Sequence, residues 1–260
     1  MFAFDHGRPA DWGRTSEDYA RYRPGPPTSF YEKLAQAGVG LPGQRVLDLG
    51  TGTGLLARAF AKRGAIVAGV DIAEGQIAMA EAEARAEGLE IDFRVAGAEH
   101  TPFDAQSFDV ITANQCWVYF DFTKTIPELR RLLAPGGKIN VSYFNFLPSE
   151  DAIVRASEEL VLKYNPEWSG GGWDGTVDQD PAWAQSLFEI SSMFCYDEEI
   201  PFTRESWCGR MRALRGIGAS LPQNEIDAFD AEHRAMLKEI AGDAFTISHR
   251  LFAHIAQFKN

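Results

Sequence analysis

The sequence predicts an α/β fold with a doubly wound, mainly parallel sheet. Between residues 44 and 144, short apolar stretches that end at glycine or acidic residues alternate with stretches whose apolar residues recur at helical spacing. Such alternation is typical of strand–helix–strand units, which pack helices on both faces of a parallel sheet. The length of 260 residues suits one large domain whose core needs no disulfide or structural metal.

The expected elements follow one another in a regular order. Ser29 and Glu32 form a capping-box pattern at the start of a short helix, for which Gly38 is the expected stop. Thr125 and Glu128 form a second capping-box pattern before the helix that precedes the last strand of this region. The five strands expected here are residues 45–50, 65–72, 91–97, 108–115 and 138–144.

The pattern changes after Phe144. Two helical stretches flank a glycine-rich loop at 169–175, and two further helices are expected within 204–240. Residues 196–203 and 245–258 read as a strand pair that completes a seven-stranded sheet. We expect the inserted helices to form a cap over the carboxyl edge of the sheet.

The amino-acid composition limits the kinds of partner that the protein is expected to bind. A formal net charge of −12 opposes attraction to phosphate backbones and anionic lipid surfaces, so we expect no nucleic acid and no membrane partner. The cysteines are too few and too scattered for a disulfide framework or a zinc site; they are Cys116, Cys195 and Cys208. Charged residues interrupt the N-terminal stretch where a signal peptide would be apolar. These features predict a cytoplasmic protein, monomeric or homodimeric.

The strongest motif is VLDLGTGTG at residues 46–54. Its glycines follow a strand and precede a helix, so the backbone can turn tightly and a ligand can approach without meeting a Cβ. A dinucleotide pattern would place its third glycine at position 55, where this chain has Leu55. The spacing therefore argues against a nicotinamide cofactor. Asp71 ends the next strand, roughly 20 residues past the first glycine, where an acidic side chain would accept hydrogen bonds from ribose hydroxyls.

At these residues the chain resembles the class I S-adenosylmethionine (SAM)-dependent methyltransferases, which implies a Rossmann-like seven-stranded sheet. Residues 96–110 resemble the third motif of the ubiquinone/menaquinone-methyltransferase-like branch, with Gly97 where that branch has an acidic residue. Residues 114–120 are placed like the fourth motif, and residues 132–144 resemble the fifth strand. The resemblance implies one domain, 1–260, with an N-terminal helical lid (1–43), a SAM-binding core (44–144), a cap and substrate region (145–245) and a final strand (246–258).

The resemblance also implies which residues contact SAM. Asp48 and the first glycines would line its methionyl part, and Asp71 with Ile72 its ribose and adenine. The N-terminal segment 18–24 resembles the one that folds over SAM in many relatives. The full set expected at the cofactor is Tyr22, Arg23, Asp48, Gly50, Thr51, Gly52, Gly54, Asp71, Ile72, Gln76, Ala98, Glu99, Asn114 and Gln115.

The expected activity is transfer of the SAM methyl group to a small molecule by direct displacement, leaving S-adenosylhomocysteine. No catalytic residue is assigned; the candidates are Tyr19, Gln115, Trp117 and Arg210. Arg210 lies in an arginine-rich helix at 204–216, where its forked guanidinium suits a carboxylate on the acceptor. The sequence contains no cluster of histidines and carboxylates that would suggest a metal site. The alternatives are carbon methylation of a quinone-like ring, a nicotinamide-dependent oxidoreductase, and SAM binding without turnover.

Overall fold

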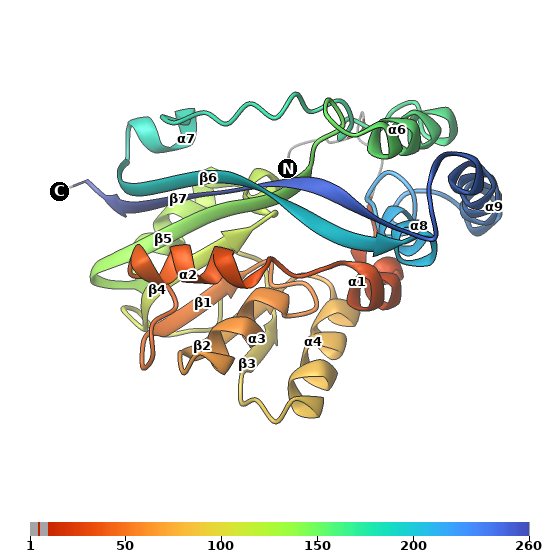
Figure 1. Cartoon of the computed structure of the whole chain (residues 1–260). Helices are drawn as coiled ribbons and strands as arrows, with labels where there is room; N and C mark the ends of the chain where they lie inside the picture. Colours follow the sequence, from red (N-terminus) through yellow and green to blue (C-terminus); the bar gives the residue numbers. More distant parts are fainter. Residues whose placement is uncertain (1–4, 6–9, 260) are drawn as a thin grey trace.

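The computed structural model describes residue 5 and residues 10–259. A seven-stranded sheet runs through the molecule in the order β3-β2-β1-β4-β5-β7-β6 (Figure 1). Neighbouring strands from β3 to β5 pair in parallel, and β7 pairs antiparallel with both β5 and β6. The predicted mainly parallel, seven-stranded sheet is confirmed. The strands are β1 (Arg45–Leu49), β2 (Ile66–Asp71), β3 (Asp92–Val95), β4 (Phe108–Asn114), β5 (Leu133–Phe146), β6 (Phe188–Thr203) and β7 (Ala244–Phe258).

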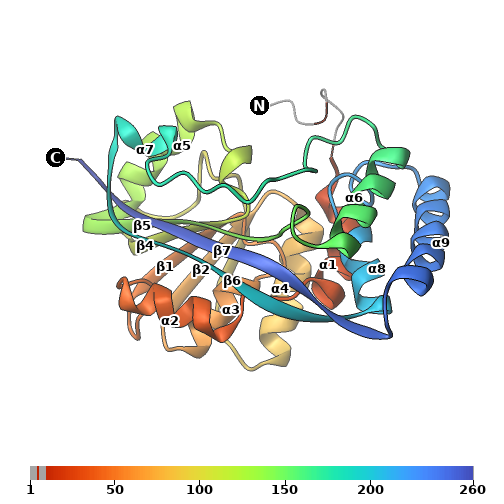
Figure 2. The same cartoon turned by 45° about the horizontal axis from the view of Figure 1, so that its top comes forward.

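Helices cover both faces of the sheet and gather at one of its ends. Figure 1 shows α2 and α3 on one face, and Figure 2 shows α5 and α7 on the other. Helices α1, α6, α8 and α9 lie together beyond the same end of β6 and β7 (Figures 1 and 2). The α-helices are α1 (Ser16–Tyr22), α2 (Thr28–Gln36), α3 (Leu55–Lys62), α4 (Glu74–Ala86), α5 (Phe122–Leu132), α6 (Ala152–Tyr164), α7 (Ala182–Gln185), α8 (Arg204–Arg212) and α9 (Gln223–Ile240), with 3-10 helices η2 (Trp12–Thr15) and η3 (Trp117–Tyr119).

Alternation along the central strands divides the core into two layers. Val46 of β1 packs with the α2–α3–α4 side, whereas its neighbour Leu47 packs with the α5 side. Both are fully buried. Successive side chains of a strand point to opposite faces, so a strand covered on both sides is apolar throughout. This is why the predicted strands read as short continuous apolar runs.

The predicted capping box at Ser29 is wrong. Helix α2 begins after Pro27, and no side chain caps it. The Ser29 hydroxyl instead donates to a carboxylate oxygen of Glu198 on β6, at 2.5 Å. A tertiary contact with a strand distant in sequence therefore replaces the local cap. The stop at Gly38 is confirmed, because this glycine has a φ of 77°.

The second predicted capping box is also wrong, because α5 begins earlier. Asp121 is its N-cap and accepts a hydrogen bond from the Thr123 backbone. Thr125 and Glu128 therefore lie inside the helix. The buried Glu128 carboxylate accepts from the Thr101 backbone at 2.8 Å, which ties the helix to the segment after β3.

The region after the glycine-rich loop contains less helix than expected. The second helical stretch reduces to the four residues of α7, and β6 begins at Phe188, well before the predicted start at 196. The added residues pair with β7, with one irregularity at Ser191. Phe188 also packs against Phe258, with 4.5 Å between ring centroids. The pairing partner lies far away in sequence, so local periodicity could not reveal this extension. The helices expected within 204–240 are confirmed as α8 and α9.

Candidate functional site

The glycine loop between β1 and α3 is open at one position and packed at two. All three glycines have positive φ, which L residues avoid: Gly50 (59°), Gly52 (56°) and Gly54 (75°). A Cβ on Gly50 would lie 2.8 Å from the Cys116 Cβ, and one on Gly54 2.8 Å from the Phe93 ring. At Gly52 the nearest side-chain atoms are 3.8 Å away. Only Gly52 therefore leaves free space on its ligand side.

Asp71, the last residue of β2, holds the loop in place. One carboxylate oxygen accepts from the Gly52 backbone at 3.0 Å, and the other accepts from the Ala73 backbone at 2.9 Å. Burial raises the pKa of Asp71, which those backbone donors partly offset. Each carboxylate oxygen can accept a further hydrogen bond, so both remain able to receive donors from a ligand.

Asp48 is the most deeply buried acid of the site. Its two oxygens accept from the hydroxyls of Thr51 and Thr112, each at 2.7 Å. Burial raises the pKa of Asp48 to about 6, and the two threonine donors oppose that rise. The carboxyl end of β1 therefore carries a buried carboxyl group whose pKa lies well above its ordinary value.

Two cavities border the glycine loop. The larger, here the β2-side cavity, has a volume of about 480 Å³. It is lined by Trp12, Tyr19, Gly50, Gly52, Asp71, Ile72, Gln76, Ala96, Ala98, Glu99, Asn114, Gln115, Cys116, Tyr119, Phe120, Asp121 and Lys124. The smaller, here the loop cavity, is lined by Tyr19, Arg23, Pro24, Pro26, Asp48, Gly50, Thr51, Leu55, Leu56, Asn114, Gln115 and Phe144.

Two polar atoms at the β2-side cavity are buried without a partner. Among the residues that the structure describes, neither the Gln76 Oε1 nor the Asn114 Oδ1 has a hydrogen-bond partner. Gln76 itself is held in place, because its amide nitrogen donates to the Trp12 carbonyl at 3.0 Å. Unsatisfied buried acceptors are costly. Their place at the cavity wall points to a ligand that carries donors.

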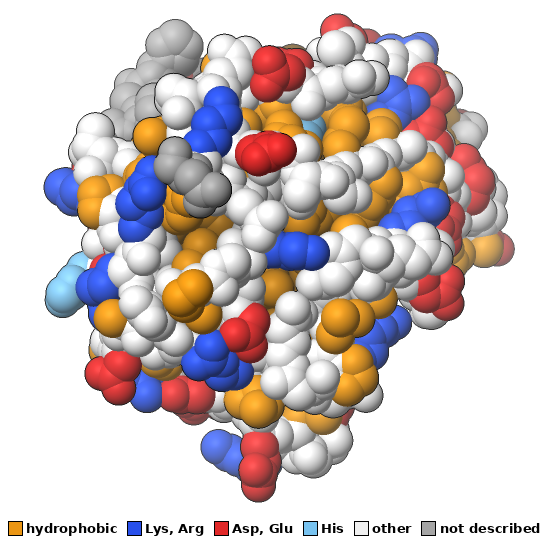
Figure 3. Space-filling model, turned by 90° about the vertical axis from the view of Figure 1, so that its left-hand side faces the viewer, with side chains coloured by type: hydrophobic (Ala, Val, Ile, Leu, Met, Phe, Trp, Pro, Cys, Tyr) orange, Lys and Arg blue, Asp and Glu red, His pale blue; other side chains and the backbone are white. Residues whose placement is uncertain are grey.

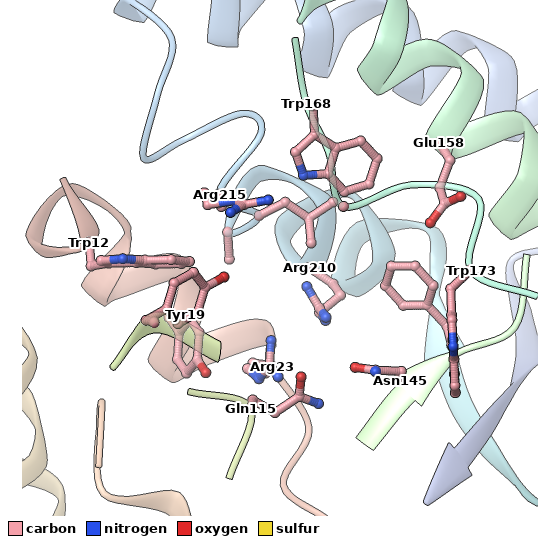
Figure 4. A pocket seen from close by; sticks show the side chains of 15 residues that line it. Trp12, Tyr19, Arg23, Gln115, Asn145, Glu158, Trp168, Trp173, Arg210 and Arg215 are labelled. Carbon is pink, nitrogen blue, oxygen red and sulfur yellow. The ribbon is translucent and has the colours of Figure 1, made fainter. Parts of the chain in front are cut away.

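A third cavity, here the cap cavity, lies under the segments that follow β5. Its volume is about 200 Å³. Figure 4 shows side chains from distant parts of the chain converging on it. It is lined by Trp12, Tyr19, Arg23, Gln115, Tyr119, Asn145, Phe146, Glu158, Trp168, Gly170, Trp173, Arg210, Ala213, Leu214 and Arg215.

Tyr19 of α1 and Gln115, directly after β4, line all three cavities. Gln115 has a φ of 67°, an uncommon conformation for a residue other than glycine. Its side-chain amide donates to the Phe144 carbonyl on β5. That contact joins the ends of two neighbouring strands and holds Gln115 at the junction. A group passing between the β2-side and cap cavities would meet these two side chains.

Known proteins share this sequence pattern. A family model described as a methyltransferase domain matches residues 47–141. A ubiquinone biosynthesis O-methyltransferase of Coxiella burnetii (strain Dugway 5J108-111) is 39% identical over 196 residues, covering 75% of this chain and 76% of that protein. One from Stutzerimonas stutzeri (strain A1501) is 35% identical over 130 residues, covering 49% of this chain and 56% of that protein. The chain belongs to the SAM-dependent methyltransferase family.

Solved structures agree on the fold. An Anaeromyxobacter dehalogenans chain described as a type II methyltransferase has a TM-score of 0.62 at 21% identity, covering 90% of this chain and 97% of that one. A SAM-dependent methyltransferase from Geobacter sulfurreducens, in complex with S-adenosyl-L-homocysteine, has a TM-score of 0.53 at 17% identity, covering 95% and 98%. At such identities the likeness concerns the fold. The chain spans little more than half the length of some curated relatives, including the Stutzerimonas protein.

The residues present fit the cofactor of this family. The open side of Gly52, the Asp71 carboxylate and the unpartnered Asn114 amide oxygen face connected space at the carboxyl ends of β1, β2 and β4. Ligands of open α/β sheets bind at this edge, where the strand order reverses. The strand order here reverses between β1 and β4. A nucleoside with hydroxyl donors and a short charged tail suits this donor and acceptor set.

Three predicted site residues lie elsewhere. The Tyr22 hydroxyl donates to Glu205 of α8 at 3.1 Å, which turns this side chain toward the cap. Trp117, 2% exposed, packs among Phe122 and Trp183 in the core and lines none of the three cavities. Gly54 packs against Phe93. A position after a strand does not determine the direction of each side chain.

The other predicted residues line at least one of the three cavities. They are Tyr19, Arg23, Asp48, Gly50, Thr51, Gly52, Asp71, Ile72, Gln76, Ala98, Glu99, Asn114, Gln115 and Arg210. Sequence reasoning missed Trp12, Tyr119 and Glu158, which also line the cavities. Tyr119 lies within the fourth-motif segment and carried a signal. Trp12 and Glu158 carried none, because neither follows a strand of the parallel region.

Proposed function

We propose that this protein transfers the methyl group of SAM to a small-molecule acceptor by direct displacement, without a metal. The observation that carries the proposal is the arrangement of cavities around Tyr19 and Gln115. On one side lie the glycine loop and Asp71, which suit the cofactor; on the other lies the separate cap cavity. Two adjoining binding spaces with a shared junction are what a transfer between two small molecules needs.

At the nucleoside end, the proposed contacts are with the β2-side cavity. Asp71 would accept hydrogen bonds from the ribose hydroxyls, and the exposed Ile72 would cover one face of the adenine. Glu99 also lines this cavity, but one of its oxygens already accepts from the Asp121 backbone at 3.1 Å. Glu99 and Ala98 would therefore border the adenine.

At the amino-acid end, the proposed contacts are with the loop cavity. Asp48 would attract the ammonium group, and Arg23 would pair with the carboxylate. The Arg23 guanidinium lies over the Tyr19 ring, 4.8 Å from its centroid. This contact orients a charged group from α1 toward the glycine loop.

The chain's contribution to the reaction is mainly alignment. Bound SAM supplies an electrophilic methyl group on a sulfonium. Tyr19 and Gln115 would border the transfer path, and the aromatic walls of the cap cavity would exclude water from it. Holding two reactants in line can supply ~7–11 kcal/mol of a barrier. In the described part of the chain, no group of three or more His, Cys, Asp and Glu side chains is placed to bind a metal.

The cap cavity favours a short acceptor over a quinone with a long apolar tail. Its volume is about 200 Å³, and charged side chains line it. The matched family model ends at residue 141, before the cap elements. The relatives' names support oxygen as the methylated atom, whereas the acceptor itself would be selected by the cap.

Two measurements test the proposal. Calorimetry should show binding of SAM and S-adenosylhomocysteine but not of NADH; the reverse would indicate a nicotinamide oxidoreductase. A mass-spectrometric screen of metabolite extracts should then show a new species heavier by one methylene, formed only with protein and SAM. The product should form equally with EDTA present. Tight S-adenosylhomocysteine binding with no product from any extract would instead support a binding protein without turnover.

We also propose that the protein acts in the cytoplasm, as a monomer or homodimer, without nucleic acid or membrane partners. Basic side chains are interspersed with acidic ones on the face shown in Figure 3, and the described cysteines are free thiols. No described helix is long and apolar enough to span a membrane. Light scattering would measure the oligomeric state, and gel-shift titration with DNA and RNA would show no complex.

A further inference from the structure

The guanidinium of Arg210 is buried in the cap cavity, and no ion pair links it to another described residue. The residue is 5% exposed, and its Nη1 has no hydrogen-bond partner among the described residues. Its guanidinium carbon lies 5.3 Å from the centroid of the Phe146 ring. Figure 4 shows the guanidinium reaching into the cavity between Arg23 and Trp173.

The other arginines of α8 are paired. Arg212 contacts Asp18 at 2.8 Å and Asp230 at 2.5 Å, and Arg204 contacts Asp243. An unpaired buried guanidinium is costly, whereas the same group paired with an anion gains charge-assisted hydrogen bonds. Burial, with the nearby charge of Arg23, lowers the pKa of Arg210 to about 9. The group remains a cation at neutral pH and lacks only its anion.

The other two arginines of the cap cavity, Arg215 and Arg23, each have another partner or another cavity. Arg215 pairs with Asp5 at 3.1 Å. Arg23 also lines the loop cavity, where the amino-acid end of the cofactor would lie. Arg210 does not line the loop cavity, so its anion belongs to a different molecule.

A buried acid limits the charge of that molecule. Glu158 of α6 is 5% exposed and lines the same cavity, and one of its oxygens accepts from the Gly172 backbone at 2.8 Å. Burial raises the pKa of Glu158. When Glu158 is ionised, a second negative charge on the ligand would be repelled by its carboxylate in a low-dielectric space. A monoanion therefore fits better than a phosphate dianion.

The volume and the aromatic lining of the cap cavity indicate the size and shape of the rest of the ligand. Cavities of roughly 150 Å³ accept a benzene ring, and this one has about 200 Å³. Aromatic side chains from four segments line it, namely Trp12, Tyr19, Tyr119, Phe146, Trp168 and Trp173. Flat apolar walls favour a planar ligand.

We propose that the methyl acceptor is a small monocarboxylic acid with a planar, apolar body, and that Arg210 holds its carboxylate in the cap cavity. This inference rests on the proposed function, because it treats the cap cavity as the acceptor site. It assigns Arg210 to recognition of the acceptor and leaves open which atom of that molecule is methylated.

Binding without turnover tests the inference. Tryptophan fluorescence of the protein saturated with S-adenosylhomocysteine is followed during titration with acetate, benzoate, phenylacetate and cinnamate. The uncharged amide of each acid and phenyl phosphate serve as comparison ligands. Trp12, Trp168 and Trp173 line the cavity, so a ligand there changes the signal. We expect at least one aromatic acid to bind at least tenfold more tightly than both its amide and phenyl phosphate.

Variants locate the carboxylate. Arg210→Gln should weaken binding of that acid at least tenfold, and Arg210→Lys should restore part of the loss. Arg204→Gln is the matched control, because it removes an arginine of the same helix that pairs with Asp243 outside the cavity. Neither Arg210 variant should change the affinity for S-adenosylhomocysteine by more than twofold. A thermal melt of each variant confirms folding.

Several results would overturn the inference. Equal binding of acids and amides, tighter binding of phenyl phosphate, or no binding by any of the acids would each contradict a monocarboxylate site. Unchanged acid binding by Arg210→Gln would remove Arg210 from it. A loss of S-adenosylhomocysteine affinity alone in that variant would assign Arg210 to the cofactor. Failure of the wild-type protein to bind S-adenosylhomocysteine would instead refute the proposed function. Titration of the unliganded protein with the same carboxylic acids would then show separately whether the cap cavity binds a monocarboxylate.

Discussion

The cofactor side and the cap side of the cleft are constructed differently. The β2-side and loop cavities use backbone turns and side chains at the ends of β1, β2 and β4, mostly within residues 48–124. The cap cavity instead combines residues of η2, α1, α6, α8, the turn after α8 and the glycine-rich loop, spread over residues 12–215. Parallel strands deliver their ends to one edge by topology, whereas the cap side depends on long-range packing of helices. A substitution that disturbs the backbone should therefore weaken ligand binding most on the cofactor side.

The largest effect is expected from Gly52→Val. The side chain would enter the open side of the loop, and the φ of 56° is unfavourable for valine. We expect SAM affinity measured by calorimetry to fall more than roughly 100-fold, or about 2.7 kcal/mol. Gly88→Val is the matched control, because Gly88 has a φ of 69° and no atom within 4 Å of an added Cβ. If both variants bind SAM equally, the loop does not face the cofactor.

Asp71→Ala should have the next largest effect. It removes the proposed acceptor for the ribose hydroxyls and the bond to the Gly52 backbone. We expect SAM affinity to fall at least tenfold, about 1.4 kcal/mol. Asp71→Asn keeps an oxygen for the Ala73 backbone and should lose less. Calorimetric affinity unchanged in the alanine variant would refute the ribose role.

Asp48→Asn should increase the free energy of unfolding at pH 7.5 and weaken SAM binding. The native pKa of about 6 lies above the usual value near 3.9. The native state therefore binds more protons than the unfolded state between about pH 4 and 6, and the free energy of unfolding falls as the pH rises through that window. We expect the Asn variant to unfold about 2–4 °C higher at pH 7.5, a gain of ~1 kcal/mol that disappears near pH 4.

The same variant should bind SAM several-fold more weakly, and wild-type affinity should fall as the pH drops below 6. Scanning calorimetry at the two pH values and titration calorimetry measure the two effects. A lower melting temperature for Asp48→Asn at pH 7.5 would show that the charge stabilises the unliganded fold. That result would contradict the proposed cost of its burial.

The smallest effect on the cofactor is expected from Arg212→Gln. This half-buried side chain joins α1 to α8 and α9 through Asp18 and Asp230, and α1 carries Tyr19. Loss of the pairs should reduce the free energy of unfolding by ~1–2 kcal/mol, because two partly buried carboxylates lose their partner. SAM affinity should fall only about threefold. The exposed pair of Arg94 with Asp92 provides the control variant, Arg94→Gln, with neither effect.

The parallel half of the molecule could be predicted from the sequence because its signals are local. Strands β1, β2 and β4 each begin or end within about two residues of the predicted bounds, and the glycine loop lies where the motif placed it. The errors arose where a distant partner decides the outcome. Ser29 bonds to Glu198 instead of capping α2, and β6 extends to Phe188 because β7 is available to pair with it.

The sequence alone determined the fold class and the position of the glycine loop, since strand periodicity and glycine spacing are encoded within a few residues. The glycine spacing argued against a nicotinamide cofactor, and the resemblance of the motifs to a known family implied SAM. The tertiary structure decided which side chains face the reaction space. Trp117 lies only two residues beyond Gln115, which directly follows β4, yet it packs into the core. Arg210 sits among other arginines of one helix, and only the packing of α1, α6 and α8 leaves its charge buried without a carboxylate partner among the described residues. Burial and pairing depend on residues far apart in the chain, and no local pattern records them.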